Sequence, residues 1–166
     1  VRWYENGRVS GQVQTQPNFT SHLVANLVGA AGFSVTQLDT DPDWEMVVQH
    51  DAATVRLDAP ATPTQAWTSA LVDTFGGSTG RRMVATGDIN NDNLTDIVVT
   101  SQDNGLVQAY LQGAGGTWRG QNIASPFGVD GVRIGDMDGD GRGDVSICTY
   151  EFTPGGDEVR VYYSRP

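Results

Sequence analysis

Lysine is absent from this chain of 166 residues, and all ten of its basic residues are arginine. The absence excludes a Schiff-base lysine as a catalytic group and the lysine of a phosphate-binding loop. Twenty acidic residues outnumber the arginines and give a formal net charge of -10. Because non-specific nucleic-acid binding rests on basic side chains that neutralise phosphates, we expect no nucleic-acid partner.

Cysteine and histidine are almost absent as well. Cys148 is the single cysteine, so no disulfide can form within the chain, and its sequence surroundings predict a small buried side chain. The two histidines, His22 and His50, accompany no Ser or Cys nucleophile motif. Outside three acidic loops the sequence shows no paired-carboxylate constellation, so we expect no catalytic activity.

Long apolar segments are also missing. No stretch approaches the roughly 20 apolar residues that span a bilayer, and no charged and then apolar signal segment opens the chain. The chain begins at Val1 rather than Met, which is compatible with a secreted product after signal removal and equally with an excised piece of sequence. We expect a secreted, extracellular or cell-surface protein without a membrane span.

One acidic run predicts a calcium site. In residues 136–144 oxygen donors occupy positions 1, 3, 5 and 9 of a nine-residue loop, and the carbonyl of position 7 adds another. Calcium takes six to eight oxygen ligands, and such a loop offers most of them. Gly141 at position 6 permits the sharp turn that an ion-wrapping loop needs. The predicted ligands are Asp136, Asp138, Asp140, Arg142 through its carbonyl, and Asp144.

The same frame fits residues 88–96. Asn93 stands at position 6, where Asn tolerates a left-handed backbone. Position 12 is Val99 in a β-branched run rather than the Glu of an EF-hand, and the loop leads into a strand instead of a helix. The predicted ligands are Asp88, Asn90, Asp92, Leu94 through its carbonyl, and Asp96, so that the sequence predicts two calcium ions.

A third and looser copy of the frame covers residues 37–45. Gln37 removes a charge from position 1, and Pro42 cannot adopt the positive φ that position 6 requires. The candidate ligands are Asp39, Asp41, Asp43 and Glu45. A turn stiffened by proline is the preferred interpretation of this loop, and a third calcium site is the alternative.

The three loops belong to a longer repeat. Gln37 and Asp88 are 51 residues apart, and Asp88 and Asp136 are 48 apart. The aromatic residues Phe19, Trp67 and Trp118 repeat at 48 and 51 residues, and such aromatics are typical of packing between repeats. Each unit contains four short apolar stretches, and the chain is rich in glycine, which favours an all-β fold of four-stranded propeller-type blades.

The repeat predicts about three and a fraction blades with incomplete ends. Residues 1–32 form the back half of a blade, 33–80 and 81–130 form whole blades, and 131–166 form the front part of another. The segment Val1-Arg-Trp-Tyr-Glu-Asn is nearly restated at the other end by Val159-Arg-Val-Tyr-Tyr-Ser. Both segments therefore correspond to the third strand of a blade.

Over nearly the whole chain, and most strongly over residues 81–166, the sequence resembles the FG-GAP/VCBS repeats of integrin-α-like propellers. Blades of that family carry Asp-x-Asp-x-Asp-Gly-x-x-Asp calcium loops, which residues 136–144 match. The resemblance implies a β-propeller fold and calcium as the cofactor. Its members include adhesion receptors, lectins and other surface proteins, and few are enzymes. Closed propellers have about four to eight blades, which is more than this chain contains.

These observations predict a non-catalytic, extracellular, calcium-binding module that serves adhesion or self-assembly. Its partner is either an extracellular protein or a second copy, which would complete the unfinished blades by strand addition in a ring or a filament. A lectin that binds glycans through Trp and Asp side chains is the alternative, with Trp44 as the candidate for a surface contact. An accessory part of a polysaccharide-active enzyme is a third.

Two short motifs concern the surface. Asn18 and Asn93 begin N-glycosylation sequons, and the second lies inside an acidic loop, where a role in the turn is the better explanation. Arg142-Gly143-Asp144 spells a cell-attachment tripeptide. We expect it to be inactive in adhesion, because Asp144 is the position-9 ligand and faces inward.

Overall fold

The computed structural model of the chain describes residues 1–6, 19–51, 53–62, 64–74, 82–126, 128–150 and 156–166. Within these ranges there are thirteen strands and no helix, which confirms the predicted all-β class. No helix in these ranges is therefore long and apolar enough to cross a membrane. The strands are β1 (Arg2–Asn6), β2 (Phe19–Leu23), β3 (Gly32–Thr36), β4 (Glu45–Gln49), β5 (Ala53–Asp58), β6 (Thr68–Thr74), β7 (Arg82–Gly87), β8 (Asp96–Ser101), β9 (Leu106–Gly113), β10 (Thr117–Ala124), β11 (Val129–Gly135), β12 (Asp144–Thr149) and β13 (Glu158–Tyr162).

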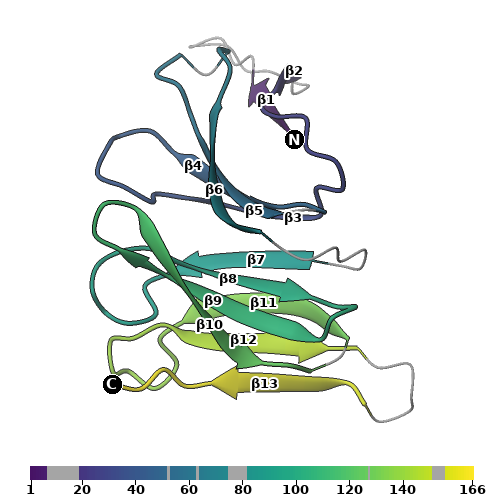
Figure 1. The fold of residues 1–166 in the computed structure, drawn as a ribbon, viewed down its shortest axis with the longest axis vertical. Helices are drawn as coiled ribbons and strands as arrows, with labels where there is room; N and C mark the ends of the chain where they lie inside the picture. Colours follow the sequence, from purple (N-terminus) through teal and green to yellow (C-terminus); the bar gives the residue numbers. More distant parts are fainter. Residues whose placement is uncertain (7–18, 52, 63, 75–81, 127, 151–155) are drawn as a thin grey trace, which may run out of the picture.

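The strands form four antiparallel sheets in which sequence neighbours pair. Two sheets have four strands, in the orders β3-β4-β5-β6 and β7-β8-β9-β10. The sheet at the amino-terminal end contains β1 and β2, and the sheet at the carboxyl-terminal end contains β11, β12 and β13. Figure 1 shows the four sheets stacked in chain order from the N-terminus to the C-terminus. The fold is thus a series of propeller-type blades with incomplete first and last members, as the sequence predicted.

Apolar clusters between consecutive sheets hold the stack together. The residues of β8 alternate between two of them: Ile97 and Val99 face the β3–β6 sheet, and Val98 faces the β11–β13 sheet. All six residues of β8 are buried because the strand is covered on both faces. A third cluster, which includes Val48 and Leu57, lies between the β3–β6 sheet and the β1–β2 sheet.

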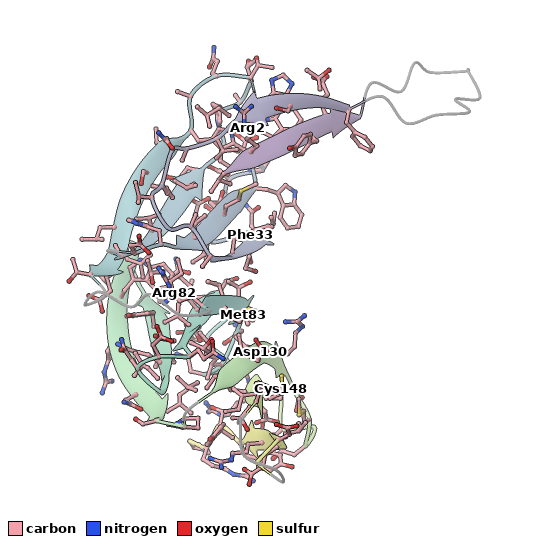
Figure 2. All side chains as sticks on the ribbon, turned by 90° about the vertical axis from the view of Figure 1, so that its right-hand side faces the viewer. Arg2, Phe33, Arg82, Met83, Asp130 and Cys148 are labelled. Carbon is pink, nitrogen blue, oxygen red and sulfur yellow. The ribbon has the colours of Figure 1, made fainter. Side chains whose placement is uncertain are left out.

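The first strand of each blade packs against the first strand of the next, since β7 contacts both β3 and β11. Glycine permits this close approach at two places. A Cβ atom added to Gly32 would lie 2.5 Å from the Arg82 carbonyl oxygen, and one added to Gly87 would lie 2.8 Å from Cγ2 of Ile134. Figure 2 shows the resulting arc, with Phe33, Met83, Asp130 and Cys148 towards its concave side.

The sequence interpretation of Cys148 was wrong, because this thiol is exposed. Its neighbours Val145 and Ile147 face the preceding sheet and are buried, whereas Ser146 and Cys148 alternate onto the opposite face of β12. That face is not covered by a further sheet in the described part of the chain.

The repeating aromatic residues are divided between packing and exposure. Trp67 and Trp118 pack against the clusters between sheets, and Trp3 packs there as well. Phe19, which shares their spacing, is 55% exposed, and Trp44 is 59% exposed. The predicted packing role therefore fits Trp67 and Trp118 and not Phe19.

Candidate metal centre

The three acidic loops occupy equivalent places in three successive sheets. Residues 37–45 connect β3 to β4, residues 88–96 connect β7 to β8, and residues 136–144 connect β11 to β12. Each loop joins the first strand of its sheet to the second, and Figure 1 shows all three on the same side of the stack. The repeat in the sequence thus becomes a row of loops along one edge of the fold.

A ladder of hydrogen bonds gives the 136–144 loop its shape. The amide of Asp140 donates to Oδ1 of Asp138 at 3.3 Å, and the amide of Arg142 donates to Oδ1 of Asp140 at 2.9 Å. Both carboxylate oxygens of Asp136 accept amides, from Gly139 at 2.7 Å and from Gly141 at 2.9 Å. In this loop the carboxylates of Asp136 and Asp138 lie close to that of Asp144.

The backbone of this loop is left-handed at two positions. Gly139 at position 4 has φ of 80° and Gly141 at position 6 has φ of 86°. The sequence pattern predicts a left-handed backbone at position 6 alone. In the 88–96 loop the same two positions are Asn91, with φ of 60°, and Asn93, with φ of 65°, as expected for a residue type that tolerates this conformation.

The 88–96 loop repeats the same ladder. The amide of Asp92 donates to Oδ1 of Asn90 at 3.2 Å, and the amide of Leu94 donates to Oδ1 of Asp92 at 2.8 Å. Asp88 at position 1 accepts the amides of Asp92 and Asn93 through its two oxygens, at 3.2 and 2.8 Å. The 88–96 and 136–144 loops have different residues at positions 2, 4, 6 and 8, and they nevertheless form the same pattern of hydrogen bonds.

The 37–45 loop keeps part of this pattern. The amides of Asp41 and Asp43 donate to the carboxylates two residues earlier, at 3.1 and 2.9 Å. Gln37 at position 1 cannot accept as a carboxylate does, and its amide group instead donates to the carbonyls of Asp39 and Asp41. Pro42 at position 6 has no positive φ.

An arginine side chain binds a carboxylate of the 37–45 loop. The guanidinium of Arg56, on β5, donates to the carboxylates of Asp39 and Asp58. The pKa of Asp39 is lowered, first by the hydrogen bond from the Asp41 amide and further by Arg56. Arg56 thus places a half-buried positive charge on this loop, whereas in the 136–144 loop the more exposed Arg165 pairs with Asp138 at 3.1 Å. The Arg56 contact supports the interpretation of the 37–45 loop as a turn.

The acid at position 9 is the deepest part of each loop. Glu45 is 1% exposed, and Asp96 and Asp144 are 0% exposed. Each accepts the amide of position 2 of its own loop, from Leu38 at 2.6 Å, from Ile89 at 2.9 Å and from Met137 at 2.8 Å. Burial raises the pKa of Glu45 and of Asp96, because it disfavours the charged carboxylate.

Two groups of carboxylates in the described residues come close enough to hold one ion. Asp136, Asp138 and Asp144 each offer an oxygen within 4.8 Å of the others, and so do Asp39, Asp41 and Glu45. Asp140 and Asp43 lie outside these groups. The 88–96 loop forms no such group of three carboxylates, since Asn90 supplies an amide oxygen at position 3. Both groups can accept a metal ion, and each has one carboxylate paired with an arginine: Asp138 with Arg165 and Asp39 with Arg56.

Side chains from each blade also bind the loop of the preceding blade. Gln112, at the end of β9, donates from its amide to Asp96 at 2.8 Å and from its side chain to the Leu38 carbonyl at 2.7 Å. In the next blade, Ser164 donates from its amide to Asp144 at 3.0 Å and from its hydroxyl to the Ile89 carbonyl at 2.8 Å. The position-9 acid thus holds the backbone of Gln112 or Ser164, and the side chain of that residue binds the preceding loop.

The 88–96 and 136–144 loops touch directly as well. The amide of Gly143 donates to the Asp88 carbonyl at 2.8 Å, and the Arg142 guanidinium donates to the Asn90 carbonyl at 2.6 Å. Arg142 and the buried Asp144 are thus both engaged inside the fold, which agrees with the expectation that the tripeptide is inactive in adhesion. These links are 52 to 75 residues apart in the chain, and the sequence carried no signal for them.

The two sequons have different outcomes. Asn93 is exposed and occupies the left-handed turn position of its loop, so its role in the turn is evident. Asn18 lies outside the described residues.

The comparisons with known proteins agree with this geometry. The family model of the FG-GAP-like repeat matches residues 88–146, which begin with one acidic loop and end just after the next. This match supports the resemblance to the FG-GAP/VCBS repeats. No curated protein matches the chain.

Proposed function

We propose that this FG-GAP-like repeat protein is a non-catalytic, extracellular module in which calcium holds the acidic loops and thereby the contacts between blades. The module then serves adhesion or self-assembly. The observation that carries the proposal is the ladder of hydrogen bonds that the 88–96 and 136–144 loops share, with side-chain oxygens at positions 1, 3 and 5 and a buried acid at position 9.

Calcium fits these donors better than zinc does. The side chains offer only oxygen, without the thiolate or imidazole that zinc prefers. In the 136–144 loop the ion would be held by Asp136, Asp138, Asp140, Asp144 and the Arg142 carbonyl. In the 88–96 loop it would be held by Asp88, Asn90, Asp92, Asp96 and the Leu94 carbonyl.

A structural role for the ion follows from the links between loops. Without a cation the carboxylates of a loop repel one another, and the loop is the acceptor for Gln112, Arg142 or Ser164 of a neighbouring blade. An ion that fixes one loop therefore also stabilises the interface with the next blade. Since metal binding of this kind is coupled to folding, calcium should raise the melting temperature.

The experiment compares thermal unfolding in calcium and in EDTA for the parent chain and for Asp138→Asn. An Asn at this position keeps an oxygen for the amide of Asp140 but removes a charge from the ion. We expect EDTA to lower the melting temperature of the parent, and the variant to need more calcium for the same stabilisation. Asp103→Asn, at an exposed turn between β8 and β9, is the matched control and should respond to calcium as the parent does. Identical melting curves of the parent in calcium and in EDTA would refute the proposal.

A further inference from the structure

Three successive carbonyls of the 88–96 loop are bound by the following blade. They belong to positions 1, 2 and 3 of the loop, and each accepts one hydrogen bond: Asp88 from the Gly143 amide at 2.8 Å, Ile89 from the Ser164 hydroxyl at 2.8 Å and Asn90 from the Arg142 guanidinium at 2.6 Å. Three peptide groups held in a row have little freedom to rotate. The backbone of positions 1 to 3 is therefore fixed from outside its own blade.

These three positions carry much of the proposed calcium site. Asp88 at position 1 and Asn90 at position 3 are two of the predicted ligands. Ile89 at position 2 donates its amide to the buried carboxylate of Asp96, the position-9 ligand, at 2.9 Å. The contacts from the following blade thus fix the backbone that bears two ligands and orients a third.

The 88–96 loop depends on such support more than the 136–144 loop does. Among the described residues, the 136–144 loop brings three carboxylates within reach of one ion, whereas the 88–96 loop has Asn90 at position 3 and forms no such group. An amide oxygen carries no net charge and attracts a cation less strongly than a carboxylate does. Affinity for the ion then depends more on how well the oxygens are held in place before it binds.

The 37–45 loop lacks most of these contacts. Among the described residues, the following blade binds only the carbonyl of position 2 there, where the Gln112 side chain donates to Leu38 at 2.7 Å. Position 7 of the following loop is Leu94, whose side chain has no donor, and the amide of position 8 forms no hydrogen bond with residues 37–45. The full set of contacts thus accompanies a loop that we propose to bind calcium and not the loop that binds an arginine.

We propose that Arg142 and Ser164 are positioning residues for calcium in the 88–96 loop, so that this site is complete only when the following blade packs against it. The inference rests on the proposed calcium binding and adds residues outside the loop to the site. Arg142 then serves two sites. Its carbonyl is a ligand in its own loop, and its guanidinium holds position 3 of the preceding loop.

The sign of the effect distinguishes positioning from electrostatics. A guanidinium close to a calcium site repels the ion, so removal of its charge would by itself tighten calcium binding. Loss of the hydrogen bond to the Asn90 carbonyl acts in the opposite direction, because position 3 is then free to turn away from the ion. Weaker calcium binding in a variant without the charge therefore measures positioning.

The test is isothermal titration of calcium into the metal-free Asp138→Asn protein, in which the 136–144 loop is weakened and the tighter event belongs to the 88–96 loop. Adding Arg142→Met removes the donors and keeps a long side chain. We expect the dissociation constant of the tighter event to rise about tenfold, as for other partners that orient metal ligands. Arg119→Met, at an exposed arginine of β10, is the matched control and should leave this constant unchanged. An unchanged or smaller constant in Arg142→Met would overturn the inference.

The reciprocal background shows whether the effect is confined to one loop. In Asp92→Asn the 88–96 loop is weakened, and the tighter event belongs to the 136–144 loop. There Arg142→Met leaves the carbonyl ligand of position 7 in place and removes a positive charge, so we expect no weakening. Equal weakening in both backgrounds would reflect a general loss of structure and would contradict the assigned role of Arg142.

Ser164→Ala tests the neighbouring carbonyl without changing a charge. In the Asp138→Asn background it removes the hydroxyl that holds Ile89, and it should raise the dissociation constant of the 88–96 loop roughly two- to tenfold. Ser164→Thr keeps a hydroxyl and should restore the affinity. Equal affinities of the Ala and Thr variants would contradict the role of Ser164.

Failure of this inference can be told apart from failure of the proposed function. If the parent binds two calcium ions and neither Arg142→Met nor Ser164→Ala weakens the 88–96 loop, the inference fails and the proposed calcium module stands. If the parent binds no calcium, both fail.

Discussion

Replacement of Asp96 by Asn tests the claim that the position-9 acid joins loop, strand and neighbouring blade. Both oxygens of this buried carboxylate accept backbone amides, from Ile89 at 2.9 Å and from Gln112 at 2.8 Å. An Asn side chain offers one oxygen and must turn its NH₂ group towards the other donor. The variant therefore loses one hydrogen bond to a charged group and leaves a buried amide without its acceptor.

The expected loss can be estimated from these contacts. A hydrogen bond to a charged group contributes about 1.5–3 kcal/mol. The raised pKa of Asp96 shows that its burial is unfavourable for the charged form, so the lower half of this range, about 1.5–2 kcal/mol, is appropriate. At about 2–4 °C per kcal/mol for a chain of this size, the melting temperature should fall by roughly 3–8 °C.

The assay is thermal unfolding followed by circular dichroism in EDTA, so that loss of a metal ligand does not contribute. Asp92→Asn is the matched control. It belongs to the same loop but is exposed, and an Asn there retains an oxygen for the Leu94 amide. We expect the control to change the melting temperature by less than half as much. An Asp96→Asn protein that melts with the parent in EDTA would refute the assigned role of the carboxylate.

Three further predictions concern the loops. Arg56→Gln should lower the free energy of unfolding in EDTA by about 1 kcal/mol or less, because the ion pair is partly exposed. Calcium should stabilise this variant more than it stabilises the parent. An equal response of the two proteins to calcium would contradict the role of Arg56 as an internal cation. Asn93→Ala should cost about 1–2 kcal/mol in chemical denaturation, because a φ of 65° is unfavourable for Ala, whereas Asn and Gly tolerate it. Asn93→Gly should therefore not cost this amount, and an Ala variant as stable as the parent would count against strain at this position. Burial raises the pKa of Glu45 and of Asp96 in the folded protein above that in the unfolded chain. The contribution of these two carboxyl groups to the stability of the metal-free protein is therefore present at a pH below their pKa in the unfolded chain, and it is lost as the pH rises through their pKa in the folded protein. Calcium requires the charged form of Asp96, so the rise in melting temperature on adding calcium should be larger at pH 7 than at pH 5, and a rise independent of pH would argue against Asp96 as a ligand.

The blade repeat could be predicted from the sequence because its signals are local. The run Ile97-Val98-Val99 and the spacing of the acidic loops depend only on strand geometry and on ligand chemistry. The left-handed turn at Asn93 was predictable for the same reason. Such local features can be interpreted without knowing which elements pack against the blade.

The rest depends on partners distant in the chain. Arg56 reaches Asp39 across 17 positions, and Gln112 reaches the Leu38 carbonyl across 74. Neither contact has a spacing rule that the sequence could reveal. Cys148 was misjudged because alternation along β12 defines two faces without indicating which of them another sheet covers.

Calcium stoichiometry measured by isothermal titration of the metal-free chain tests the central claim most directly. The account predicts two ions per chain, one in the 88–96 loop and one in the 136–144 loop, with the Arg56-bound 37–45 loop taking none. Asp138→Asn should weaken one of the two binding events and leave the other unchanged. Absence of calcium binding at millimolar concentration, where extracellular modules bind it, would contradict the account.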